Sequence, residues 1–84
     1  MMTSRDEKIP YGIVDNVALL GAVVRAKRRS LGLTQAEAAA LSGVGNRFLS
    51  ELERGKASCE LGKSLQVLTR LGVEVMLQPR GAKR

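Results

Sequence analysis

TQAEAAALSGVGNRFLSELER, the stretch from Thr34 to Arg54, decides the fold of this chain. Thr34 followed three residues later by Glu37 is typical of a capping box, in which each side chain accepts a hydrogen bond from the other residue's backbone amide. The alanines that follow are strong helix formers, and Ala39 is small enough to lie where two helices meet at a steep angle. This part of the stretch predicts a short helix that begins at Gln35.

A tight turn and a second helix are expected in the rest of the stretch. Gly43 can adopt the positive φ that such a turn usually requires. The second helix is expected to begin at about Asn46 and to end before Gly55. With Leu49 and Leu52 facing inward, the stretch has the spacing of a helix-turn-helix, which places its second helix in the major groove of DNA. An ordinary αα-hairpin in a small helical bundle is the alternative interpretation.

The composition of the whole chain favours a polyanion as its partner. Its 84 residues suffice for one small domain, and 14 basic against 8 acidic residues give a net charge of +6. A membrane surface would also attract this charge, but the longest apolar run, residues 17–24, is far too short to span a bilayer. We therefore expect a cytoplasmic, nucleoid-associated protein with double-stranded DNA as its partner and no membrane.

Residues that usually carry catalysis or bind metals are scarce. The chain has no histidine and one cysteine, Cys59, so it offers no zinc-site spacing and no cysteine–histidine pair. Its serines have no base partner in the sequence, and no glycine-rich loop matches a phosphate cradle. We expect no enzyme, no cofactor and no metal, and we interpret Cys59 as a packing residue rather than a redox site.

Two further helices are expected to flank the motif. Asp15 or Asn16 can cap the first, and Ser58 can cap the second. The first is expected to reach Leu31 and the second to cover residues 59–71. The apolar face of the second is expected to comprise Leu61, Leu65, Leu68 and Leu71.

The hydrophobic period changes after residue 72. Apolar residues Val73, Val75 and Leu77 alternate with other residues until Pro79, which predicts one β-strand. A lone strand leaves its backbone unpaired, so we expect it to pair with the same strand of a second subunit across a two-fold axis. Within the chain only residues 9–14 could pair with it, and a strand added to a partner protein is the other alternative.

These features divide the chain into four regions. Residues 1–12 are interpreted as a flexible N-terminal arm, and residues 13–71 as the helix-turn-helix domain with its motif at 34–54. Residues 72–79 are expected to form the dimerisation strand, and residues 80–84 a short basic tail.

Two segments of the chain resemble the Xre/Cro/phage-repressor type of helix-turn-helix: LGAVVRAKRRSLGLTQ at 20–35 and SGVGNRFLSELERGK at 42–56. ELGKSLQVLTRLGVEVMLQPR, which follows at 60–80, resembles more narrowly the HipB-like antitoxins. The resemblance implies a mainly α fold: a four- to five-helix, lambda-repressor-like DNA-binding domain with one C-terminal β-strand that pairs across a homodimer. It also implies a partner in the operon, a HipA-like serine/threonine kinase toxin that the antitoxin restrains while the complex represses its own promoter.

The resemblance assigns DNA contacts to the motif. The positions that reach base edges correspond to Gly45, Asn46, Arg47, Ser50 and Glu51. Asn46 suits adenine N6/N7 and Arg47 suits guanine O6/N7, each as a bidentate contact. Thr34 and Gln35 are counted with the DNA-binding residues; Gln35 stands where the family bonds a phosphate and braces the first recognition residue, Asn46.

Residues outside the recognition positions receive roles from the same resemblance. The family's buried arginine–glutamate brace falls on Arg28 and Glu53. Lys56 matches a phosphate-contacting lysine, and Arg54 is a second phosphate contact. Leu41 departs from the family at a position that is usually polar, where it can pack against the last helix or contact a partner.

Two other positions depart from the family pattern. Gly45 replaces a side chain that often touches DNA, so one base contact is expected to be absent. Ser42 stands where an apolar residue is commoner.

Three functions are compatible with this sequence. The first is an antitoxin that binds operator DNA as a dimer and neutralises a kinase, and the second is a stand-alone repressor of phage or plasmid type. The third is an interaction module whose helix-turn-helix is vestigial. Asn46, Arg47 and Lys56 are all expected on the DNA-facing side, which argues against the third function.

Overall fold

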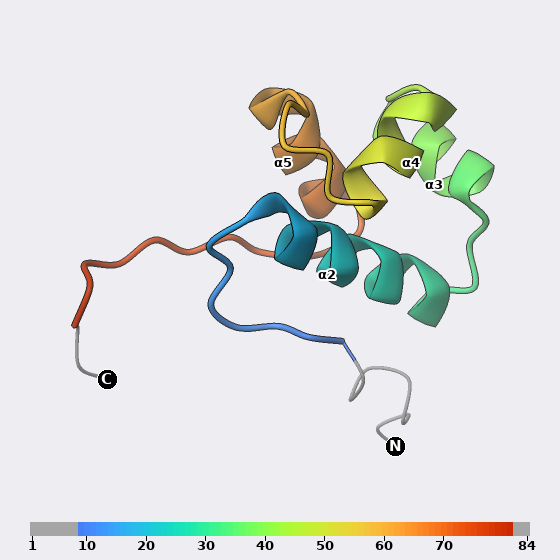
Figure 1. The fold of residues 1–84 in the computed structure, drawn as a ribbon. Coiled ribbons are helices and arrows are strands. Elements are labelled where there is room, and N and C mark those ends of the chain that lie inside the picture. The colour runs from blue at the N-terminus through green and yellow to red at the C-terminus, as the bar shows by residue number, and fades with distance from the viewer. Residues whose placement is uncertain (1–8, 82–84) are drawn as a thin grey trace, which may run out of the picture.

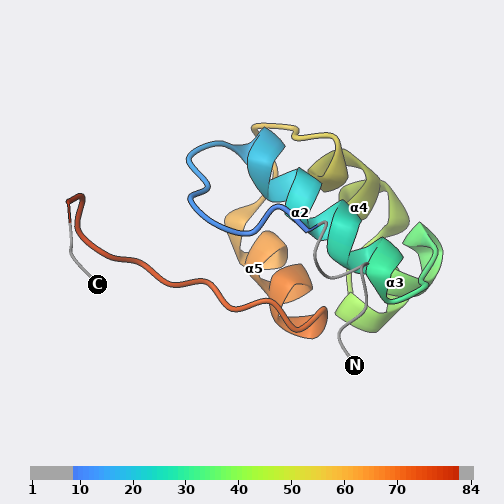
Figure 2. The same ribbon diagram turned by 90° about the horizontal axis from the view of Figure 1, so that it is seen from below.

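The computed structural model describes residues 9–81, and within this range the chain forms four α-helices (Figure 1). The helices are α2 (Val17–Ser30), α3 (Gln35–Ser42), α4 (Asn46–Glu53) and α5 (Leu61–Arg70). The mainly α fold class is confirmed. The longest helix, α2, lies along one side of the other three and packs against α4, and α3 packs against both α4 and α5 (Figures 1 and 2).

The first two helices begin at side-chain caps. Asn16 Oδ1 accepts from the Leu19 amide at 2.9 Å, ahead of α2. The expected capping box starts α3: Thr34 Oγ1 accepts from the Glu37 amide at 3.1 Å, and Glu37 Oε1 accepts from the Thr34 amide at 2.9 Å. Gly43 ends α3 with φ of 72°, a left-handed conformation that glycine adopts without a steric penalty. These local signals give the motif its first helix and its turn.

The start of α5 differs from the prediction. The helix begins at Leu61 rather than at residue 59, because the Cys59 amide donates to the Lys56 carbonyl at 3.2 Å in a turn that precedes it. The residue before the helix is Glu60, so the prediction of Ser58 as the cap was wrong.

The buried face of α5 also differs from the predicted leucine stripe. The stripe that faces the core consists of Ser64, Val67, Leu68 and Leu71. Leu61 and Leu65 are instead 67% and 41% exposed. Positions 64, 67, 68 and 71 have the i, i+3, i+4, i+7 spacing of one helix face, and Leu61 and Leu65 lie beside that face.

All four helices contribute to one aliphatic core. Its buried members are Val24, Ala38, Ala39, Leu49, Leu52, Val67, Leu68 and Leu71. Because these side chains are small or medium-sized, the short helices can approach one another closely.

The closest approach joins α2 to the end of α4. A Cβ atom built on Gly21 would overlap the backbone carbonyl oxygen of Leu52. A Cβ on Gly55 would lie 2.7 Å from the Ala18 Cα, so two backbones touch on both sides of this crossing. Ala39, the small residue expected at a helix crossing, is buried as well. Gly21 is therefore a second small residue on which the packing depends.

Residues 73–79 extend away from the helices instead of forming a strand (Figures 1 and 2). Residues 9–81 contain no β-strand, because a strand needs a second backbone edge and residues 9–14 make no ladder with this segment. Val73 remains half-buried, with its amide donating to the Leu68 carbonyl at 2.8 Å. Pairing of the segment between two subunits stays a prediction.

The N-terminal segment lies next to α2 (Figure 2). Ile9 is buried, so the range expected to be a flexible arm, 1–12, includes at least one residue with a packing role. Residues 1–8 of that arm and residues 82–84 of the basic tail lie outside the described residues. Between residues 9 and 81, no helix is both long and apolar enough to cross a lipid bilayer.

Candidate nucleic-acid interface

One side of α4 is buried and the other presents polar side chains to solvent. Leu49 and Leu52 are fully buried and fix the rotation of the helix against the core. Asn46 and Arg47 at the start of α4 are exposed, and the Arg47 side chain is 89% accessible. Ser50, one turn further along, is half-buried. The burial of Leu49 and Leu52 thus leaves the Asn46 amide and the Arg47 guanidinium on the solvent side of α4.

Thr34 and Gly45 add little side-chain chemistry to this surface. The Thr34 hydroxyl is engaged in the capping box with Glu37. Gly45 precedes α4 in an extended conformation, and a Cβ built on it would meet no atom within 4 Å. The missing side chain at Gly45 therefore leaves open space beside the start of the recognition helix.

A buried ion pair fixes the end of α4 to α2. Arg28 Nε donates to Glu53 Oε2 at 2.6 Å and Arg28 Nη2 donates to Glu53 Oε1 at 3.0 Å, in bidentate geometry. The two side chains are 10% and 2% exposed. Arg28 Nη1 also donates to the Leu33 carbonyl at 2.8 Å, in the loop between α2 and α3. One guanidinium therefore joins α2, this loop and the end of α4.

Gln35 belongs to the same network. Its Nε2 donates to Glu53 Oε1 at 3.0 Å, so Glu53 accepts from both α2 and α3. Gln35 and Asn46, which the sequence resemblance placed together, share no hydrogen bond among the described residues. Gln35 instead ties the first helix of the motif to the last residue of the second.

Glu51 pairs with two of the predicted DNA-binding cations. Its Oε2 accepts from Arg47 Nε at 3.2 Å, and its Oε1 lies 3.2 Å from Lys56 Nζ. The Lys56 hydrogen bond, followed by the Arg47 hydrogen bond, lowers the pKa of the Glu51 carboxyl below its ordinary value. The i,i+4 spacing of Arg47 and Glu51 is a sequence signal for the first pair. Lys56 follows the helix end, so its pairing depends on the turn at Gly55.

Two more cations lie on or beside the motif, Arg54 at its last position and Lys63 on α5. Arg54 Nη1 donates to Ser50 Oγ at 3.1 Å, which aligns this exposed guanidinium with α4. Lys63 Nζ lies 5.7 Å from the centroid of the Phe48 ring, within the range of a cation–π contact. Sequence analysis did not identify Lys63, since nothing in the pattern shows that α5 brings it to Phe48.

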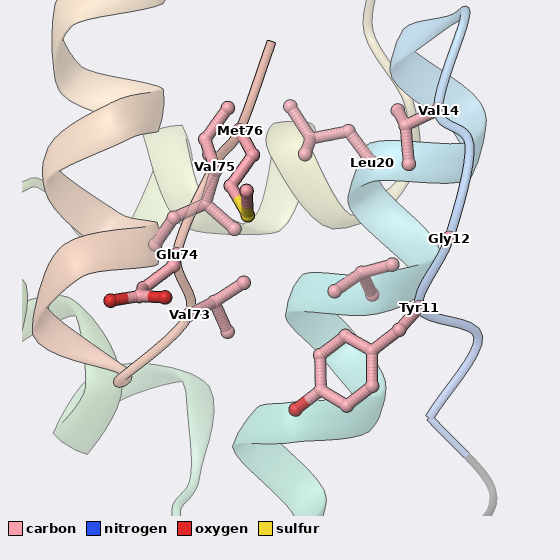
Figure 3. A pocket seen from close by; sticks show the side chains of 10 residues that line it. Tyr11, Gly12, Val14, Leu20, Val73, Glu74, Val75 and Met76 are labelled. Atoms are coloured by element: carbon pink, nitrogen blue, oxygen red, sulfur yellow. The ribbon is translucent and has the colours of Figure 1, made fainter. Parts of the chain in front are cut away.

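An open hollow of about 180 Å³ separates the two extended segments of the chain (Figure 3). Tyr11 and Val14 lie on one side of it, and Val73, Val75 and Met76 on the other. Two of the three residues predicted for dimerisation, Val73 and Val75, thus line one apolar depression, whereas Leu77 does not.

Comparison with known proteins agrees with this geometry. The model of a helix-turn-helix family matches residues 24–75, which include both helices of the motif, the brace and α5. The chain is also similar to a curated protein of Sinorhizobium fredii (strain NBRC 101917 / NGR234), the uncharacterized HTH-type transcriptional regulator y4mF. The two are 43% identical over 65 residues, which cover 77% of this chain and 86% of that protein.

Proposed function

This chain belongs to the helix-turn-helix family of transcriptional regulators, and we propose that it is a dimeric operator-binding repressor that also neutralises a HipA-like serine/threonine kinase as its antitoxin. The observation that carries the proposal is the exposed side of α4. Asn46 and Arg47 extend into solvent there, from a helix that the buried Arg28–Glu53 pair holds in place. Rigid support of this kind is what base recognition requires, because donors must meet base edges in fixed geometry.

Base and phosphate contacts are divided between two sets of residues. Asn46 can bind adenine N6/N7, and Arg47 can bind guanine O6/N7 through its two terminal nitrogens. Ser50 lies one turn further along α4, where its hydroxyl accepts a hydrogen bond from Arg54. Arg54 and Lys56 supply phosphate contacts, which add affinity for any sequence.

Two copies are proposed to pair through residues 72–79. Val75 is 51% and Leu77 93% exposed, on an extended backbone that has no partner within the described chain. Pairing with the same segment of a second copy would satisfy backbone groups and cover both side chains. A two-fold symmetric dimer would read two half-sites about 34 Å apart, one helical turn of DNA.

The kinase contact is proposed to include Leu41. This side chain lies near the end of α3 and is 49% exposed, at a position where a polar residue would be expected. The resemblance to HipB-like antitoxins supplies the class of partner, and an exposed leucine supplies an apolar contact.

Expression of the tagged chain from its native operon tests both parts of the proposal. Nuclease footprinting on the upstream DNA should give two protected half-sites related by two-fold symmetry. Mass spectrometry of the purified complex should identify a kinase-like protein encoded beside this chain, and Leu41→Lys should weaken its recovery without changing the footprint.

Each outcome selects one function. A footprint without a kinase partner favours the alternative, a stand-alone repressor of phage or plasmid type. Kinase recovery without any footprint would favour an interaction module and refute operator binding.

A further inference from the structure

Glu51 is the carboxylate that lies between the two exposed cations of the recognition surface. Its side chain is 17% exposed, whereas those of Arg47 and Lys56 are 89% and 48% exposed. The backbone carbonyl of Glu51 also accepts from the Lys56 amide at 3.1 Å. Lys56 is therefore held to Glu51 at its backbone and at its ammonium group.

Glu51 contacts Arg47 through an atom that bidentate recognition of a base does not need. Arg47 uses Nε toward Glu51, and among residues 9–81 its Nη1 and Nη2 atoms have no hydrogen-bond partner. Bidentate recognition of guanine needs two adjacent donors of a planar guanidinium, and the Nη1 and Nη2 groups can provide them. Lys56 similarly offers two further protons to a phosphate.

We propose that Glu51 is a positioning residue that orients Arg47 toward guanine and Lys56 toward a phosphate, and thereby raises sequence specificity. This inference rests on the proposed DNA-binding function and names how the same surface discriminates between sequences. The carboxylate need not touch DNA, since it acts through the two side chains that do.

Two effects of Glu51 on binding have opposite signs. Its negative charge repels the phosphates of every duplex, which lowers affinity regardless of sequence. Its hydrogen bond with Arg47 restricts the conformations of this long side chain before DNA binds. The restriction raises affinity only for duplexes that place a guanine opposite the oriented guanidinium. Together they lower non-specific binding and raise the ratio of specific to non-specific affinity.

The test compares two duplexes of equal length. One is the sequence that the wild-type protein enriches from a random-sequence duplex library, and the other is a duplex that it does not enrich. Glu51→Ala removes both the negative charge and the contacts with Arg47 and Lys56. Glu51→Gln removes the charge but keeps an acceptor oxygen, and Glu60→Gln is the matched control, an exposed carboxylate whose removal changes the net charge equally.

Glu51→Ala should bind the other duplex more tightly and should lower the ratio of the two affinities about two- to fivefold. Glu51→Gln should retain part of that ratio, and Glu60→Gln should shift both affinities alike. Repeating the selection with Glu51→Ala should relax the preference for guanine at one position in each half-site. Thermal unfolding midpoints within the wild-type range exclude a folding defect.

Equal tightening on both duplexes by Glu51→Ala would overturn the inference, because Glu51 would then act through its charge alone. A wild-type protein that enriches no sequence would instead refute the proposed function, which separates the two failures.

Discussion

Arg28 Nε lies 2.6 Å from Glu53 Oε2, inside a protein whose only other described ion pairs are at the surface. The pair joins the second half of α2 to the last turn of α4, and Gly21 brings the backbones of the same two helices into contact. The position of the recognition helix α4 thus depends on one buried ion pair and on one close contact between backbones.

Arg28→Met should destabilise the fold strongly, because it leaves the buried Glu53 carboxylate without its cationic partner, with only the neutral Gln35 amide still donating to it. The expected loss is about 3–5 kcal/mol of unfolding free energy, measured by urea denaturation. Arg25→Met on the exposed side of α2 is the control and should change stability by less than about 0.5 kcal/mol. Similar small losses for both variants would show that the brace is unimportant.

Gly21→Ala should destabilise the protein although alanine favours helices. The added methyl group would overlap the Leu52 carbonyl oxygen, and overpacking of this kind costs about 1–3 kcal/mol. Gly62→Ala is the matched control within α5, where the nearest atom is the flexible Glu60 carboxylate. The control should leave stability unchanged or raise it by up to about 1 kcal/mol. A stable Gly21→Ala protein would contradict the close approach of α2 and α4.

Ser42→Ala should stabilise the protein. The Ser42 hydroxyl is buried and finds no hydrogen-bond partner among residues 9–81, an arrangement that costs about 1–3 kcal/mol. We expect a gain of about 1 kcal/mol, measured as a rise in Tm. Ser64→Ala is the control, since Ser64 Oγ donates to the Glu60 carbonyl at 2.9 Å, and its removal should give no gain. A lower Tm for Ser42→Ala would mean that the hydroxyl has a partner.

The Glu51 carboxyl should titrate below its ordinary value of 4.5. Because the folded-state pKa is lowered, the stabilisation from its ion pairs is fully present above pH 4.5 and is lost as the pH falls through the lowered value. NMR titration of the Glu51 side-chain carbon measures this midpoint. Lys56→Met should return the midpoint toward 4.5 further than Arg47→Met, since the Lys56 hydrogen bond is the larger cause. A midpoint that neither variant changes would contradict the two ion pairs.

Leu77→Asp should prevent dimerisation without unfolding the helices. The side chain is 93% exposed on the extended C-terminal segment, so the helical core does not depend on it. Sedimentation equilibrium should report a monomer, with the helical circular dichroism signal retained. Gln78→Asp is the control, because successive residues of a strand point to opposite faces, and it should stay dimeric. A dimeric Leu77→Asp protein would refute pairing through this segment.

The motif could be predicted from the sequence because its signals are local. Thr34 and Glu37 cap a helix through bonds three residues apart, and Gly43 has the positive φ that its turn needs. Leu49 and Leu52 carry the spacing of a buried helix face and are buried. The start of α5 was misplaced, because the turn that closes between Cys59 and Lys56 competes with a helix of similar local preference.

The sequence by itself determined the two helices of the motif, the Thr34 cap, the turn at Gly43 and the side of α4 that carries Asn46 and Arg47, since these depend on neighbours within a few residues. Only the tertiary structure decided that Gly21 is a crossing point and that Gln35 donates to Glu53. Such contacts join residues whose spacing along the chain carries no period, so they exist only once helix packing has set the distances between side chains.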